Sequence, residues 1–213
     1  MKRSLSSLCR ALSLSLLVVA PVALRANIVN NPDFETGDLT DWTFVGSPLT
    51  PWSVATTAFG ITKAQSGSDF ADTQCGGADC ITTPNSAIYQ DLTTVAGQTY
   101  TLTFWYDIGV CNALLPTQCG AVELKVFWGS TTADDIVTTA SSYTDPGWVE
   151  ATVTGLTATS TSTELEFAGE QDSAWLGLDN ITVNASSSPE PSTAALFGIA
   201  LAAAAALRRR RAA

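Results

Sequence analysis

The chain of 213 residues contains no histidine. This absence removes the side chain most often used for acid–base catalysis near neutral pH and a common ligand of zinc. Basic residues are almost as scarce in the middle of the chain, where residues 27–188 hold only Lys63 and Lys125. The sequence also lacks a Gly-x-Ser-x-Gly nucleophile motif and a phosphate-cradling glycine loop. These absences argue against the commonest routes of enzymatic catalysis.

Acidic side chains dominate the same region. Residues 27–188 contain 19 acidic residues against two lysines, a net charge of about −17. Two lysines cannot form the basic patch that nucleic acid requires, so nucleic acid is excluded as a partner and cations are the natural counter-partners. Glycosidases can work with two carboxylates alone, but the acid spacing singles out no pair. We therefore expect a non-catalytic protein.

Helical periodicity is missing between the two ends of the chain, whereas several segments alternate apolar and polar residues with period two. In 100–108, for example, Tyr100, Leu102 and Phe104 share one side. Turn residues separate such segments at 95–98, 145–147 and Thr154-Gly155. We expect an all-β fold, an antiparallel β-sandwich of the jelly-roll kind. The predicted strands are 27–30, 41–45, 52–55, 70–73, 87–91, 100–108, 122–128, 148–154, 164–168 and 175–183.

The first 26 residues have the layout of a secretory signal peptide. Lys2, Arg3 and Arg10 precede an apolar run over 11–23, which is too short for a permanent membrane span. We expect cleavage after Ala26, so that a β-sandwich domain over 27–185 begins the mature protein.

Cysteine usage agrees with export. Cys9 leaves with the signal peptide, and Cys75, Cys80, Cys111 and Cys119 remain. An even number of cysteines in an exported chain predicts two disulfides. Among the three possible pairings, the short spacings favour the pairs 75–80 and 111–119. A zinc site is the alternative, in a chain without histidine.

The last 25 residues form a membrane-addressing segment. After a short linker at 186–188 come Pro189-Glu190-Pro191, an apolar stretch over 194–207 and a basic tail over 208–211. The proline-flanked tripeptide stays extended, and the arginines resist translocation. A helix of 14 residues spans roughly 21 Å of a hydrocarbon core about 30 Å thick. We interpret 194–207 as a transient transmembrane anchor; an ordinary single-pass C-terminal anchor is the alternative.

This order of elements closely resembles the PEP-CTERM sorting signal of Gram-negative bacteria. The resemblance implies that residues 189–213 are recognised by an exosortase, a membrane-embedded processing enzyme. It also implies transient anchoring in the inner membrane and then delivery to the cell surface or an exopolysaccharide matrix. The residues that match the signal are Pro189, Glu190, Pro191, Arg208, Arg209, Arg210 and Arg211.

Three motifs in the body resemble the galactose-binding-like jelly rolls that include many carbohydrate-binding modules. Asn31-Pro32-Asp33-Phe34-Glu35-x-Gly37 opens the domain, Ala96-Gly97-Gln98-Thr99-Tyr100 lies in its middle, and Leu178-Asp179-Asn180-Ile181 closes it. The resemblance covers nearly the whole mature domain and implies that extracellular polysaccharide is its ligand.

The same resemblance implies a structural calcium where the opening motif meets the last strand. The matching residues are Glu35 and Asp179, and the backbone near Gly37 with the Asp33 or the Asp38 side chain would complete the six to eight oxygens that calcium needs. The alternative is that Asp33 and Asp38 cap turns while Asp179 accepts hydrogen bonds from loop amides.

Aromatic residues at outward positions suggest a ligand-binding face. Trp105, Phe127 and Trp148 share the outward parity of their strands with Asp107, and aromatic planes with acids suit the binding of sugar rings. We expect these four residues on one sheet. In the alternative, covering loops bury Trp105 and Trp148 as a satellite core. Trp42 and Trp175 are expected in the main core.

Together these features predict an exported, non-catalytic envelope or matrix protein that binds carbohydrate through a calcium-stabilised β-sandwich. The main alternative is a purely structural matrix protein without a specific ligand. Ice binding, suggested by Thr99, Thr101 and Thr103, and glycoside-active catalysis are weaker alternatives.

Overall fold

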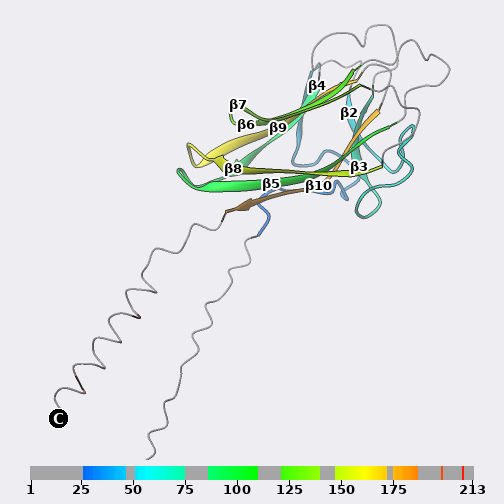
Figure 1. Ribbon diagram of the computed structural model, residues 1–213. Helices are drawn as coiled ribbons and strands as arrows, with labels where there is room; N and C mark the ends of the chain where they lie inside the picture. Colours follow the sequence, from blue (N-terminus) through cyan, green and yellow to red (C-terminus); the bar gives the residue numbers. More distant parts are fainter. Residues whose placement is uncertain are drawn as a thin grey trace, which may run out of the picture.

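Two antiparallel five-stranded sheets pack face to face in the computed structural model, with β6, β7 and β9 in the upper layer of Figure 1 and β5, β8 and β10 in the lower. The structure describes residues 26–46, 51–74, 86–109, 121–139, 147–171 and 175–186, together with Gly198 and Arg208. The first sheet has the strand order β1-β4-β9-β6-β7, and the second has the order β2-β3-β10-β5-β8. The predicted all-β sandwich is confirmed.

The strands follow the alternation of the sequence closely. They are β1 (Thr43–Gly46), β2 (Trp52–Ala55), β3 (Phe70–Gln74), β4 (Ser86–Thr93), β5 (Thr99–Ile108), β6 (Ala121–Trp128), β7 (Thr131–Thr139), β8 (Val149–Thr157), β9 (Ser162–Gln171) and β10 (Trp175–Ala185).

Two expectations about strands are wrong. The segment 27–30 is not a strand, although the Ile28 N–H donates to the Val183 carbonyl over 3.1 Å and holds it beside β10. Strand β7 is absent from the predicted set. It is an edge strand with only one neighbouring strand. Asp134 and Asp135 lie in its middle, so its apolar pattern is too weak to identify it from the sequence.

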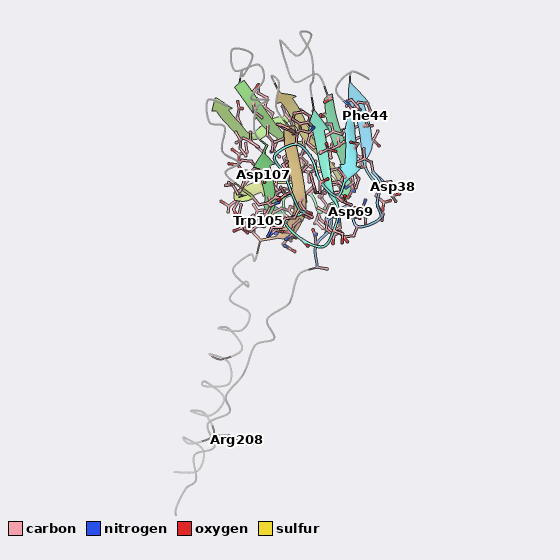
Figure 2. All side chains as sticks on the ribbon, turned by 90° about the vertical axis from the view of Figure 1, so that its right-hand side faces the viewer. Asp38, Phe44, Asp69, Trp105, Asp107 and Arg208 are labelled. Atoms are coloured by element: carbon pink, nitrogen blue, oxygen red, sulfur yellow. The ribbon has the colours of Figure 1, made fainter. Side chains whose placement is uncertain are left out.

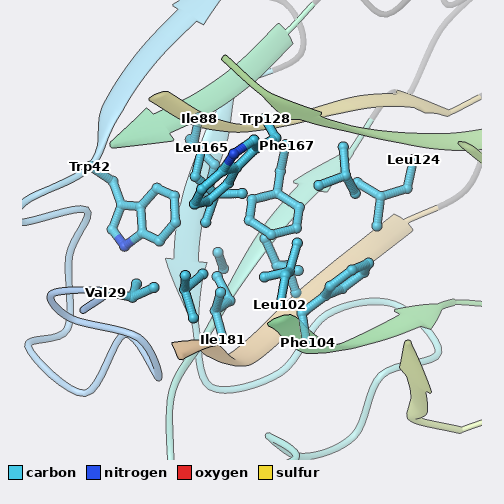
Figure 3. Close-up of a cluster of buried hydrophobic side chains, with 14 of the residues drawn as sticks. Val29, Trp42, Ile88, Leu102, Phe104, Leu124, Trp128, Leu165, Phe167 and Ile181 are labelled. Atoms are coloured by element: carbon cyan, nitrogen blue, oxygen red, sulfur yellow. The ribbon is translucent and has the colours of Figure 1, made fainter. Parts of the chain in front are cut away.

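The inward faces of both sheets form one continuous core (Figure 3). Along β5 the alternation buries Tyr100, Leu102 and Phe104, as predicted. Phe104 meets Phe167 of β9 edge to face, with ring centroids 5.2 Å apart, and so joins the two sheets. Trp42 lies in this core as expected, 6.1 Å from Phe167. Each such side chain contributes about 1.5–3 kcal/mol through burial.

The predicted turn at Thr154-Gly155 is instead a bulge inside β8. Tyr100 pairs with Leu156 whereas Leu102 pairs with Val153, so β8 has an extra residue between these pairs. Gly155 adopts a φ of 77°, which a side chain would disfavour. The sequence correctly indicates an irregular backbone at this glycine, but the strand continues on both sides of it.

The segment 56–69 covers part of the outer face of the second sheet with a smaller apolar cluster. Ile61, Ala64 and Phe70 are its buried members. Trp175 belongs here and not to the main core as expected, because it begins β10 on the outward side and packs against Phe59 at a centroid distance of 5.0 Å.

The opening motif is fastened to the last strand. The Ile181 N–H donates to the Pro32 carbonyl over 2.8 Å, and the Val183 N–H donates to the Asn27 side chain over 2.8 Å. The two ends of the sandwich domain therefore lie side by side.

Candidate functional site

The four predicted ligand residues do not share one face. Trp105 and Asp107 both lie near the end of β5 of the second sheet (Figure 2). Trp148 immediately precedes β8 of the same sheet, whereas Phe127 lies on β6 of the first sheet. The expectation of one common face is wrong, since the alternation of a strand does not say in which sheet the strand lies.

Trp148 packs beneath the segment 56–69, and Asp107 is buried in the second sheet. The Trp148 ring meets Phe70 edge to face at 5.5 Å, and its Nε1–H donates to the Lys63 carbonyl over 2.9 Å. Asp107 is buried, with 2% of its surface exposed. The alternative of a satellite core is confirmed for Trp148. Trp105 stays half-buried between Asp179 of β10 and Glu150 of β8.

A groove lies on the first sheet instead, with a volume of about 310 Å³. Its position follows from small residues in register. Gly46, Ser86 and Gly169 oppose one another across β1, β4 and β9, and Ala87 and Ala168 form the next row. Because small side chains stand side by side there, the surface is hollowed. The lining residues are Val45, Gly46, Ser86, Ala87, Phe127, Glu166 and Ala168.

Aromatic side chains flank a carboxylate along the groove. Glu166 of β9 lies directly between Tyr89 of β4 and Phe127 of β6, so the two rings stand on strands about 10 Å apart. All three side chains are partly buried. Burial, and after it the charge of Glu164, raises the pKa of Glu166. The arrangement can hold an apolar ring face and accept hydrogen bonds from the same ligand.

Ser86 borders the groove, but its side chain follows Ile88 and Leu92 to the inward side of β4. Ser86 is 2% exposed, and its Oγ forms no hydrogen bond with the described part of the chain. A buried polar group without a partner is destabilising by about 1–3 kcal/mol. This hydroxyl lies on the core side of the sheet and is not a contact for a ligand in the groove.

Sequence reasoning identified Phe127 but missed Tyr89 and Glu166. Tyr89 and Glu166 did carry a signal, because both occupy outward positions in segments predicted as strands, 87–91 and 164–168. What was missing was the order β4-β9-β6, which places them beside Phe127.

The predicted metal residues meet at the segment 65–69. One Glu35 oxygen accepts the Ser68 and Asp69 N–H groups over 2.6 and 2.7 Å. One Asp179 oxygen accepts those of Gln65 and Ser66, both over 2.9 Å. Two carboxylates, from the opening motif and from β10, therefore hold one loop.

Asp179 is an uncommon carboxylate. It is fully buried, and burial raises its pKa to about 6, against the lowering effect of the Ser66, Asn180 and Gln65 amides. The nearby charge of Asp33 raises the pKa further. No lysine or arginine in the described part of the chain forms an ion pair with it.

Gly37 and Asp38 form a turn beside these residues. The Gly37 N–H donates to the Phe34 carbonyl over 2.9 Å, and Asp38 accepts the Thr40 N–H over 2.9 Å. These contacts, and those of Asp179, are the ones expected from the alternative without calcium. Across the described residues, no three acidic or cysteine side chains gather as a metal-binding group.

Other predicted residues lie outside the described part of the chain, so the structure does not test them. The disulfide expectation falls there with Cys75, Cys80, Cys111 and Cys119. Of the sorting residues, Arg208 is described and exposed. The others lie outside the described residues: Pro189, Glu190, Pro191, Arg209, Arg210 and Arg211. Among the helices of the described residues, none has the length and apolar character to cross a membrane.

The end of the chain matches a known motif. Residues 189–211 carry a PEP-CTERM protein-sorting motif. Such a motif implies an exported protein that is anchored transiently in a membrane and processed by an exosortase. No curated protein is detectably similar to the chain in sequence.

Solved structures share the fold of the sandwich. The carbohydrate-binding module TmCBM61, in complex with β-1,4-galactotriose, superposes with a TM-score of 0.53 at 16% identity, over 76% of this chain and 99% of that one. The K1 cleaved adhesin domain of Lys-gingipain from Porphyromonas gingivalis W83 gives 0.53 at 17% identity, over 73% and 96%. A cyclase from Fischerella sp. TAU gives 0.52 at 15% identity, over 76% and 97%. The jelly-roll fold is thus shared by binding modules and enzymes.

Proposed function

We propose that this protein is an exported component of the bacterial cell surface or extracellular matrix that binds polysaccharide without catalysis. The observation that carries the proposal is the groove of the first sheet, where Phe127 and Glu166 border a floor of alanine and glycine. Sugar rings present C–H faces that pack on aromatic planes, while their hydroxyls bond to carboxylates. At about 310 Å³ the groove is at the lower end of the size range of ligand pockets.

The sorting motif supports the location. An exported protein released by an exosortase meets the polysaccharides of its own envelope, which makes them the available ligands. The alternative is a structural matrix protein whose sandwich has no specific ligand.

Affinity electrophoresis of the exported protein in gels containing the producing organism's exopolysaccharide, together with a panel of neutral glycans, tests the proposal. We expect retarded migration, and we expect Phe127→Ala and Tyr89→Ala each to reduce the retardation. Val95→Ala is the matched control, because Val95 is exposed in the turn between β4 and β5. Unchanged mobility in every gel would favour the structural alternative. Sugar release during incubation would contradict the non-catalytic role.

We propose in addition that calcium stabilises the junction of the opening motif with β10. Glu35 and Asp179 would supply carboxylate oxygens, with Asp33 and the backbone near Gly37 as further ligands. Each carboxylate already accepts loop amides but keeps free lone pairs. The pKa of Asp179, raised by burial and by Asp33, marks a buried acid that a cation would stabilise. We expect the melting temperature to be higher in calcium than in chelator. Magnesium in place of calcium is the control. An unchanged melting temperature would contradict it.

A further inference from the structure

The groove lies on a strongly acidic face. Glu166 lines it, and Glu164 stands two residues earlier on the same side of β9 with Asp91 directly opposite on β4. On β6 the side that carries Phe127 also carries Glu123. On β7, Asp135 faces Lys125. Acidic side chains from four strands therefore surround the place where a ligand would lie.

Basic side chains do not balance this charge. Lys125 stands beside Ala168 of the groove floor, but its charge is paired with Glu123, with 2.6 Å between Nζ and Oε1, and Asp135 is its direct neighbour on β7. Lys63, the other lysine of residues 27–188, belongs to the segment over the second sheet, away from the groove. An anionic ligand would therefore meet net repulsion here.

The groove instead has the features that attract a small cation. Glu166 stands between the rings of Tyr89 and Phe127, and aromatic faces attract ammonium groups in addition to any carboxylate. Burial and neighbouring acids also raise the pKa of both Glu166 and Asp135, so positive charge brought near them would be stabilising.

We propose that the groove prefers glycans whose sugars carry free amino groups and rejects those that carry carboxylates. This inference rests on the proposed function, since it names the ligand class of the same groove. The ammonium group would lie against Glu166 between Tyr89 and Phe127, and the sugar ring would cover the alanine floor formed by Ala87 and Ala168.

Three oligosaccharides of equal length test the inference: a glucosamine oligomer, its N-acetylated counterpart and a uronic acid oligomer. Binding to the exported protein is measured by calorimetry at about pH 6, where the amines and most carboxylates are charged. We expect the glucosamine oligomer to bind about tenfold more tightly than the N-acetylated one, and the uronate not to bind. Rising salt should weaken only the amino-sugar binding.

Two isosteric variants separate a specific site from general attraction to an acidic protein. Glu166→Gln should lower the affinity for the glucosamine oligomer about tenfold and leave the N-acetylated one unchanged. Glu150→Gln removes the same charge from an exposed position of the second sheet and should have no effect.

Equal losses in the two variants would overturn the inference, because the attraction would then be diffuse. Equal affinity for amino and N-acetylated oligomers, or binding of the uronate, would also overturn it while leaving the proposed function intact. Failure of these three and of every neutral glycan to bind would overturn the proposed function and the inference together.

Discussion

Asp179 is a buried carboxylate that joins β10 to the loop over the second sheet. Its two oxygens accept backbone N–H groups of Gln65, Ser66 and Asn180. These bonds favour the ionised form, but burial outweighs them and holds the pKa near 6. The residue therefore holds the loop at a cost in stability when it is charged.

This cost predicts a dependence of stability on pH. The folded-state pKa, about 6, lies above the ordinary value of 3.8, so the folded protein binds the proton more tightly. The resulting stabilisation is complete below about pH 3.8 and is lost as the pH rises through about 6. We expect the free energy of unfolding of the wild type, relative to Asp179→Asn, to fall by up to about 3 kcal/mol from about pH 4 to about pH 7.

Urea unfolding of both proteins across this pH range, in chelator, is the measurement. Subtracting the unfolding free energy of Asp179→Asn from that of the wild type cancels the contributions of the other acidic residues. A difference that does not change with pH would contradict the raised pKa. If calcium binds as proposed, adding it should flatten the curve, because the cation stabilises the ionised form.

Gly177 illustrates a requirement for a small residue in β10. A Cβ atom at this position would lie 2.9 Å from Ile61 Cδ1 and 3.0 Å from the Trp148 ring. We expect Gly177→Ala to destabilise the protein by about 1–3 kcal/mol through overpacking, measured by urea unfolding. Gly97→Ala is the comparison, since no atom lies within 4 Å there and only its φ of 80° opposes a side chain. A stabilised Gly177→Ala protein would show that the cluster has unused space.

At the scale of elements, the segment 56–69 decides which face of the sandwich is open. It covers the second sheet because Glu35 and Asp179 hold its backbone and because its own Ile61 and Ala64 pack with Phe70 of β3. The first sheet has no such cover among the described residues, and the groove lies there.

Hydrogen exchange tests the hold on this segment. Glu35→Ala removes the acceptor of the Ser68 and Asp69 N–H groups, and we expect these two amides to exchange faster. Asp38→Ala is the matched control, because the Asp38 side chain forms hydrogen bonds with Thr36 and Thr40 of its own turn. Unchanged exchange at residues 68 and 69 in Glu35→Ala would mean that the apolar cluster alone holds the segment.

The strands differ in how well their sequence identifies them. Central strands such as β5 and β6 alternate clearly, because both neighbours and the core act on them. Edge strand β7 is half-exposed and carries adjacent aspartates, so its pattern is weak. The bulge of β8 at Gly155 looks like a turn in sequence, since a glycine with positive φ serves in both.

At the scale of the whole molecule, the sorting motif makes a prediction about the mature protein. Exosortase processing should remove the apolar stretch and the basic tail over 208–211, so the intact mass of the surface-released protein should correspond to a chain that ends near Pro191. Replacing Pro189, Glu190 and Pro191 by alanine should leave the protein at full length in the membrane fraction. A released wild-type protein that retains residues 208–211 would contradict processing.

The sequence alone determined the fold class. Apolar residues recur at every second position, and wherever burial is strong this alternation shows which side of each strand faces inward. It also determined that the protein carries a sorting signal, because the sorting motif works as a linear segment. It identified Glu35 and Asp179 as partners of one junction through resemblance to a known fold.

Only the tertiary structure decided which outward residues meet. Strand order placed Glu166 between Phe127 and Tyr89, on the sheet opposite to that of Trp105. Small residues in register across β1, β4 and β9 opened the groove. The sequence left open whether a loop covers Trp148, and the packing of the segment 56–69 decided it. The physical reason is that alternation records the side of a strand, whereas neighbours depend on contacts between residues far apart in the chain.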